Sequence, residues 1–392
     1  MAGIYMPGLN LIRPDYKVFH KNDSTTEFHF RLNSENILYT RKRGDSIFSS
    51  NILIHYELLD KKTEDLIDSA SIHFTDYNGN KTKKYLDGKI ALTSKPGKEY
   101  HLLVTFNDLS RDHYIRKRVH VNRLNYSNAQ NYLIVDSNEN VVFKNYFKKN
   151  DQITIIKNGS NTTPSLLLKC YSTNLPIARP PFSENNANNK TELLPDFTEE
   201  IPFDSLNRLN YIITKKGLYH FQTSATKKEG PTLFNFQENF PKVRSVENMV
   251  EPMRYITTKK EFTFLYESED KKAAVDKFWL DVAGSSERAR TLIREYFNRV
   301  ESSNHYFTSY MEGWKTDRGI IYIIYGSPNV IYKGKDYENW IYGEENNVMS
   351  VSFTFSKVNN PISNNDYQLN RSSSYKNTWF RAVDSWRSGR VY

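Results

Sequence analysis

The sequence has almost no cysteine. Cys170 is the only one in 392 residues, which excludes an intramolecular disulfide and any metal site built from several thiolates. Cys170 follows the apolar residues 166–168 in a predicted strand. A buried, unreactive thiol is therefore expected there, and the fold must be stabilised by packing.

Long apolar runs are also missing. The longest clear one, residues 320–325, is bounded by glycines and falls far short of the ~18 residues that a membrane-spanning helix needs. We therefore expect no transmembrane segment. Residues 1–7 show no basic stretch followed by an apolar one, so no signal peptide is visible. The chain is then either cytosolic or a mature or truncated form.

The motifs that bind nucleotides or zinc are absent as well. The sequence contains no Gly-x-Gly-x-x-Gly or phosphate loop and no His-x-His or His-Glu-x-x-His, so no cofactor and no metal are expected. Six of the nine histidines fall between apolar residues on the polar phase of predicted strands. We interpret them as facing solvent; they are His29, His55, His73, His101, His120 and His220.

Charge is present but dispersed. The 54 basic and 45 acidic residues give a net charge of +9. The densest basic clusters, 41–43 and 116–118, lie beside predicted strands, and no nucleic-acid-binding module accompanies them. They indicate solvated surface, and nucleic acid is not expected as a partner.

What the sequence does contain is alternation typical of antiparallel sheets. In residues 1–125, apolar and polar residues alternate in runs such as 28–32, 52–58 and 100–106, separated by turn signals such as Asp87-Gly88 and Pro96-Gly97. This pattern predicts a β-sandwich. Residues 126–230 continue it more loosely and predict a second sandwich-like domain.

The character changes in residues 231–392, which hold all five tryptophans. Apolar residues recur at helical spacing in 275–282 and 289–300, with Ser285 or Ser286 as a helix cap. Residues 320–325, 330–332, 340–342 and 351–355 read as strands, and 379–386 as a short helix before Gly389. The predicted fold is thus multidomain: two antiparallel β-sandwich-like domains followed by a C-terminal α+β domain.

The segment 313–319 joins the helical part to the apolar run 320–325. Thr316 and Asp317 can accept hydrogen bonds from nearby backbone amides, and Gly319 can adopt a φ that other residues resist. Because residues 320, 321, 323 and 324 are all isoleucine, the run is predicted to be a central strand covered on both faces, with Trp314 packed over its start.

This stretch resembles the GWxTD-domain family, named for the pattern that Gly313, Trp314, Thr316 and Asp317 form here. The resemblance covers about residues 245–392 and is weak in the front half, where only 38–41 are similar. Further matching positions are Phe278, Trp279, residues 288–300, Arg318, Gly319, Gly326, Pro328, residues 338–342, Trp386, Arg387, Val391 and Tyr392.

The resemblance implies a bacterial cell-envelope protein, mainly of Bacteroidota, in a family without a generally established activity. It implies periplasmic or outer-membrane-associated localisation, with a signal segment and lipidated cysteine ahead of Met1 as the possible membrane attachment. The implied partners are other envelope proteins, in an outer-membrane-associated complex.

Asp317, Arg318 and His305 could be imagined as an acid, an electrostatic clamp and a base. Their spacing does not require this, and no nucleophile with a base accompanies them. We therefore assign no catalytic residue and interpret Asp317 as a turn-capping carboxylate. Two aromatic pairs are candidates for an exposed patch, with core packing the favoured interpretation: Trp340 with Tyr342, and Trp379 with Trp386.

The sequence leads to a non-enzymatic interaction or scaffold subunit of a cell-envelope assembly. A glycan-binding or cell-wall-binding module is the alternative, and it needs an exposed row of aromatic rings. A hydrolase acting on envelope polymers is the second alternative, and it needs two carboxyl groups about 5–9.5 Å apart in a cleft.

Overall fold

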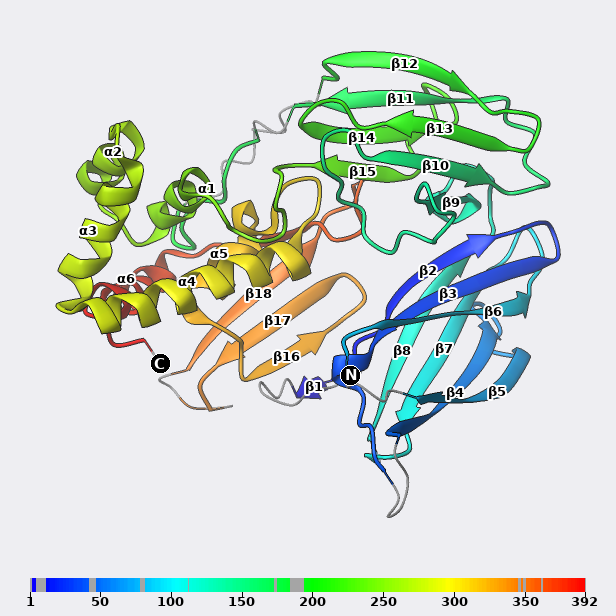
Figure 1. The fold of residues 1–392 in the computed structure, drawn as a ribbon, viewed down its shortest axis with the longest axis horizontal. Coiled ribbons are helices and arrows are strands. Elements are labelled where there is room, and N and C mark those ends of the chain that lie inside the picture. Colours follow the sequence, from blue (N-terminus) through cyan, green and yellow to red (C-terminus); the bar gives the residue numbers. More distant parts are fainter. Residues whose placement is uncertain are drawn as a thin grey trace.

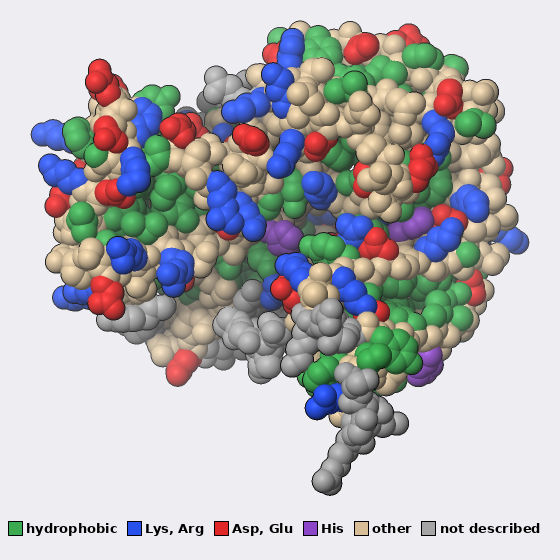
Figure 2. Space-filling model, viewed as in Figure 1, with side chains coloured by type: hydrophobic (Ala, Val, Ile, Leu, Met, Phe, Trp, Pro, Cys, Tyr) green, Lys and Arg blue, Asp and Glu red, His purple; other side chains and the backbone are tan. Residues whose placement is uncertain are grey.

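The computed structural model describes residues 12–41, 47–77, 82–111, 113–172, 175–183, 194–344, 347, 350–360 and 362–391, together with the backbone of 2–4. Lys and Arg side chains are interspersed with Asp and Glu over the face shown in Figure 2. This distribution agrees with the interpretation of the dispersed charge as solvated surface.

The first sandwich packs a three-stranded sheet against a four-stranded one (Figure 1). The strand orders are β2-β3-β6 and β5-β4-β7-β8, all antiparallel. Inward residues such as Phe28, Ile54 and Val104 are completely buried between them, which confirms the predicted alternation. The strands are β2 (Asp15–His20), β3 (Thr25–Asn33), β4 (Ser49–Asp60), β5 (Leu66–Tyr77), β6 (Tyr85–Thr93), β7 (Glu99–Asp108) and β8 (His113–Asn122).

The second sandwich also has a three-stranded and a four-stranded sheet, in the orders β13-β10-β9 and β12-β11-β14-β15. Ile155, Leu166 and Phe221 lie in its core. The strands are β9 (Tyr132–Val135), β10 (Gln152–Lys157), β11 (Ser165–Tyr171), β12 (Phe197–Pro202), β13 (Arg208–Ile212), β14 (Gly217–Gln222) and β15 (Thr232–Asn235).

The C-terminal part combines helices with a five-stranded antiparallel sheet, β1-β16-β17-β18-β19, and α4 and α5 lie across one face of this sheet (Figure 1). The multidomain β, β, α+β architecture is as predicted. The strands are β1 (Ala2–Ile4), β16 (Val330–Lys333), β17 (Tyr337–Tyr342), β18 (Val351–Lys357) and β19 (Tyr367–Leu369). The helices are α1 (Val246–Val250), α2 (Lys259–Glu267), α3 (Lys271–Ala283), α4 (Ser286–Phe307), α5 (Asp317–Tyr325) and α6 (Lys376–Arg387).

Two of the predicted helices correspond to α3 and α4. Ser285 caps α4 by accepting a hydrogen bond from the backbone N–H of Arg288. Within the described residues, none of the helices is both long enough and apolar enough to span a membrane.

The prediction of a central strand at residues 320–325 is wrong, because this run lies in helix α5. The side chain of Thr316 caps the helix by accepting from the N–H of Gly319. Ile320, Ile321, Ile323 and Ile324 are at most 3% exposed. Their i, i+1, i+3, i+4 spacing marks one broad helix face. A short run that is apolar on both phases fits a buried helix as well as a central strand, and here the cap and the packing outweigh the β-propensity of isoleucine.

The assignment of His29 and His220 to solvent is also wrong, since they are 7% and 1% exposed. His29 lies 3.0 Å from the carboxylate of Glu27, and His220 bonds Thr232 and the carbonyl of Lys228. Both residues lie on strands inside their sheets, β3 and β14, with a strand paired on either side. A period-two pattern shows which phase is polar but not what covers it.

Buried contacts join the three parts. Phe19 of the first sandwich packs with Leu133 and Val135 of the second. A second cluster connects the second sandwich to the C-terminal part: Tyr171, Leu218, Phe234, Phe236 and Phe240, with Tyr146, Tyr310 and Ile362 against them.

Replacing Phe236, which is 4% exposed, tests this junction. Phe236→Ala should lower the free energy of unfolding by about 3–5 kcal/mol, since it removes a buried ring and leaves a cavity. Thermal unfolding followed by calorimetry measures the effect. Phe264→Ala, at a ring 56% exposed, is the control and should change stability by at most about 0.5 kcal/mol. Equal losses would contradict the role of the junction.

Candidate functional site

Trp314 lies in a short 3₁₀ turn, Gly313–Lys315, between α4 and α5. Its side chain is 3% exposed and meets Tyr255 edge-on at 6.2 Å between ring centres. The backbone of Trp314 is held on both sides: its N–H donates to Oδ1 of Asn304, and its carbonyl accepts from the Tyr255 hydroxyl. The ring is therefore core, as predicted, and is not an open binding surface.

The two glycines that bracket the motif allow backbones to touch. A Cβ on Gly313 would lie 1.8 Å from the carbonyl oxygen of Ser303 in α4, and one on Gly319 would lie 1.9 Å from the carbonyl oxygen of Gly313. The expectation that Gly319 supplies an unusual φ is wrong. Gly319 lies inside α5 and is absent from the positive-φ glycines, whereas Gly326 after the helix has φ +81°.

Asp317 is engaged by groups far away in the sequence. Its Oδ2 accepts from the N–H of Leu369 at 2.8 Å and from Nη1 of Arg371 at 3.0 Å, and its Oδ1 accepts from Nη2 of Arg371. The two side chains are 11% and 9% exposed. The carboxylate also sits in the first turn of α5, where the helix dipole favours a negative charge. Asp317 thus joins α5 to the β19 edge, instead of capping only its own turn.

Arg318 is buried among aromatic rings. Its guanidinium lies 4.0 Å from the ring centre of Tyr367 and 5.2 Å from that of Phe307, and its Nη1 is 3.4 Å from Oε2 of Glu338. Burial lowers the pKa of Arg318. Burial alone would raise the pKa of Glu338, but the charges of Arg318 and Lys333 hold it below its usual value.

His305 does not join Asp317 and Arg318. Burial lowers the pKa of His305, opposed by the charge of Asp15 in the first sandwich and reinforced by that of Arg13. The acid, clamp and base considered from the sequence are therefore not assembled as a unit around His305.

The other predicted site residues are mostly internal. Trp340, Trp379 and Trp386 are 1–4% exposed, while Tyr342 is half-buried and donates its hydroxyl to the carbonyl of Gly326. Pro328 is also buried. The favoured core interpretation of these rings is confirmed, and they form no exposed row for a sugar.

A cavity of about 640 Å³ adjoins the motif. Glu312, Trp314 and Lys315 line it from the motif side, and residues of the second sandwich and of helices α1, α2 and α3 complete the lining. Glu312 is 8% exposed, and burial raises its pKa despite Lys315 Nζ at 2.5 Å from Oε2. The sequence analysis missed this acid, whose only signal is its position directly before Gly313.

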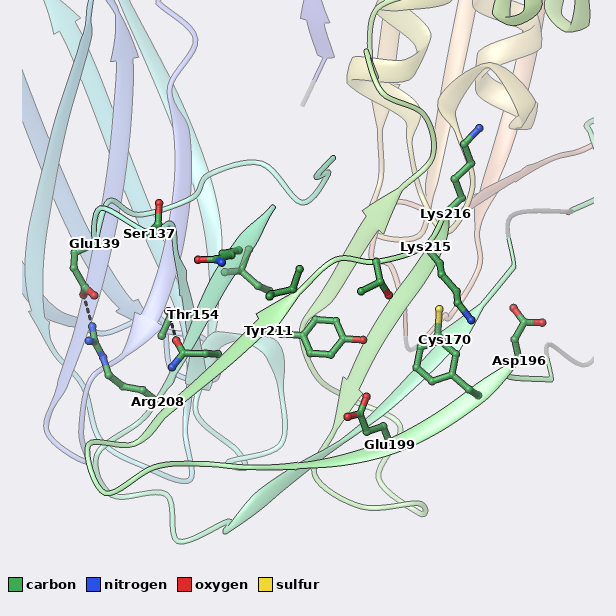
Figure 3. A pocket seen from close by; sticks show the side chains of 16 residues that line it. Ser137, Glu139, Thr154, Cys170, Asp196, Glu199, Arg208, Tyr211, Lys215 and Lys216 are labelled. Atoms are coloured by element: carbon green, nitrogen blue, oxygen red, sulfur yellow. Dashed lines mark hydrogen bonds and ion pairs between the residues drawn. The ribbon is translucent and has the colours of Figure 1, made fainter. Parts of the chain in front are cut away.

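A larger groove, of about 950 Å³, lies on the second sandwich between the edge strands β12 and β13 (Figure 3). At one end Arg208 pairs with Glu139. At the other, the side chains of Lys215, Asp196 and Cys170 converge near Tyr211 and Glu199 (Figure 3). The sequence analysis did not find this groove, because its residues come from segments far apart in the chain.

The groove does not assemble an obvious reactive centre. Cys170 is 2% exposed, and burial raises its pKa to about 11, so the thiolate that reacts as a nucleophile is scarce at neutral pH. This agrees with the expected inert thiol. Across the described ranges, no group of three or more His, Cys, Asp or Glu side chains is placed to hold a metal ion.

Residues 217–388 match the family model described as the GWxTD domain. The match includes the whole motif and begins at the first residue of β14. No curated protein matches the chain. Among solved structures that do, one is described as trypsin-activated alpha-2-macroglobulin from Escherichia coli, at 7% identity and a TM-score of 0.20. The match covers 60% of this chain and 17% of that one, and at this TM-score it carries no argument.

Gly313→Ala should destabilise the protein by about 3 kcal/mol, because backbone must move to make room for the new methyl group. Gly159→Ala is the matched control, since its Cβ would lie 3.4 Å from the nearest backbone atom. Chemical denaturation of both variants provides the comparison. A Gly313→Ala protein as stable as Gly159→Ala would show that the close approach is not required.

Asp317→Asn should lower stability by about 3 kcal/mol, because it removes the carboxylate from a buried ion pair while keeping the side-chain shape. In a double-mutant cycle with Arg371→Met, the double variant should lose less stability than the sum of the single losses. Additive losses would mean that the pair does not hold α5 to β19.

Proposed function

We propose, from the premise that this chain carries a GWxTD domain, that it is a non-enzymatic interaction or scaffold subunit of a bacterial cell-envelope assembly. The observation that carries the proposal is that the residues of the family's motif make their contacts inside the protein. Trp314, Asp317 and Arg318 are bonded inside the protein and hold helices to a sheet. A family signature that serves folding suits a protein whose function is to present surfaces.

The way the three parts are joined supports the same function. Buried apolar clusters connect each sandwich to its neighbour in the chain, so the parts form a continuous body. Modules joined in this manner present binding surfaces at defined distances from one another, because relative motion would expose apolar area.

The envelope setting rests on the family resemblance. We propose that the protein acts in the periplasm or at the outer membrane, in contact with other envelope proteins, and that a lipid anchor ahead of this sequence would hold it there. Its dispersed surface charge suits protein partners better than nucleic acid.

One observation favours a glycan-binding function as the second candidate. The groove on the second sandwich is lined by Asp196, Glu199, Lys215 and Tyr211, which combines hydrogen-bonding groups of both kinds with an aromatic ring. Such a lining suits a polyhydroxylated ligand. Trp340, Trp379 and Trp386, which the sequence offered as candidates for an exposed aromatic patch, do not line this groove. Asp317, bonded to Arg371, is not available as an acid for the hydrolase alternative.

Isolation of the tagged full-length protein from its own membranes tests the proposal. We expect one or a few chains to co-purify in fixed ratio after mild detergent extraction, and an unrelated envelope protein with the same tag should not recover them. Recovery of the chain as a lone soluble species would contradict the scaffold function.

The glycan candidate has a separate test. If it is correct, calorimetric titration with cell-wall or surface oligosaccharides should show binding that Tyr211→Ala weakens at least tenfold, while Phe264→Ala leaves it unchanged. Absence of binding by the wild type, or equal binding by both variants, would exclude the groove as a glycan site.

A further inference from the structure

Strand β5 of the first sandwich is a long edge strand with little cover. It has 12 residues and, among the strands that the structure describes, pairs with β4 alone, at the outer side of the four-stranded sheet (Figure 1). Nine of its residues are exposed, among them Leu66, Ile67, Ile72 and Tyr77 at 38–65%. An exposed edge of this length is a template for adding another strand.

The register shows which backbone groups are free to bond. Leu109 donates its N–H to the carbonyl of Asn51, so the odd-numbered residues of β4 bond toward β7 and the even-numbered ones toward β5. The even-numbered residues of β5 are opposite those of β4. The register shifts by one residue at a bulge between Leu58 and Leu59, so this parity holds for residues 68–77 of β5. The backbone groups directed away from the sheet are therefore those of residues 69, 71, 73, 75 and 77.

The two edges of this sheet are protected very differently. The opposite edge strand, β8, carries Arg116, Lys117 and Arg118, and charges of one sign on an edge repel a second strand of the same kind. β5 contains no Lys, Arg or Pro. The residues whose backbone groups point away from the sheet, Ser69, Ser71, His73, Thr75 and Tyr77, include no Asp, Glu, Lys or Arg.

The two acids of β5 do not oppose pairing, because both are engaged within their own sandwich. Asp68 accepts from the N–H of Thr93 and from the Tyr56 hydroxyl. Asp76 accepts from the Tyr39 hydroxyl and from Lys84.

The inward face of β5 is also incompletely covered. Ile72 on that face is 38% exposed, and Phe74 is half-buried. The facing sheet has only three strands, with β6 as its nearest member, so it leaves apolar area at this flank. A further strand next to β5 would cover part of that area.

We propose that β5 pairs antiparallel with β5 of a second copy of this chain, across a two-fold axis, to form a continuous eight-stranded sheet. An antiparallel strand is self-complementary under two-fold symmetry. In such a pairing β-branched residues, serines and one aromatic stand opposite one another without fixed like charges. The pairing covers the exposed β5 edge of each copy, so no β5 edge is left for a third copy and the assembly stops at a dimer. This inference is independent of the proposed function, which concerns other partners.

Sedimentation of the full chain over the micromolar range tests the dimer. We expect a mass that rises from monomer to dimer with concentration. Ser71→Lys places two ammonium groups near the axis and should weaken dimerisation at least tenfold. Thr198→Lys, on the exposed edge strand β12, is the matched control and should leave it unchanged. Because each copy carries +9, higher salt should strengthen the dimer.

A monomer at all concentrations would overturn the proposal and would leave a strand from another protein as the remaining occupant. A dimer that persists in Ser71→Lys would overturn it too, because the interface would lie elsewhere. Melting temperatures of the variants close to that of the wild type confirm that both lysine variants are folded.

Cysteine cross-linking gives a second readout. The native Cys170 is buried, so new thiols react without interference from it. Single variants Ser69→Cys, Ser71→Cys and His73→Cys should yield disulfide-linked dimers under mild oxidation, most efficiently at the position nearest the axis. Thr198→Cys should not. Equal cross-linking at Thr198, or none at all three β5 positions, would contradict β5 pairing.

Discussion

The close contact of the 3₁₀ turn at residues 313–315 with α4 and α5 is the constraint on which the C-terminal part depends. Backbone atoms meet there at a distance that leaves no space for a side chain on Gly313 or Gly319. This approach places Trp314 against Tyr255 and begins α5 at the point where Asp317 can reach β19. Trp314 and Asp317 act as structural groups because the two glycines bring their neighbours together.

Charged groups inside this part are tolerated because each has a partner. Asp317 has Arg371 and a backbone N–H, while Arg318 has Glu338 and two aromatic faces. Burying these charges costs free energy, and removing one partner would leave the other uncompensated. The network therefore favours one arrangement of α5 against the sheet. Such specificity suits a body that must hold several surfaces in fixed positions.

In the first sandwich, the two edge strands of the four-stranded sheet differ in how they are protected against pairing. β8 carries basic residues, whereas β5 carries none and exposes backbone N–H and C=O groups along its free edge. A sheet that is protected at one edge but not at the other has an asymmetry that self-pairing would explain. The groove between β12 and β13 is a different kind of surface, since its lining carries charged side chains of both signs, which suit a polar ligand.

Much of the fold followed from local pattern. Alternation over 52–58 and 100–106 predicted β4 and β7, helical spacing predicted α3 and α4, and the letters at 313–317 were enough to indicate the GWxTD resemblance. Local pattern was insufficient for residues 320–325, because four isoleucines on both phases fit a buried helix and a central strand equally. It was insufficient for His29 and His220 as well, since alternation shows which phase of a strand is polar but not how deeply that phase is buried.

The sequence by itself determined most of the sandwich strands, helices α3, α4 and α6, and the buried character of Trp314, because these depend on the order of apolar and polar residues along short segments. Tertiary structure alone decided that Asp317 binds Arg371, that Glu312 is buried beside the motif, and that β5 lies open. These outcomes depend on which distant segments come into contact. That contact is set by the packing of whole layers, which no single segment encodes.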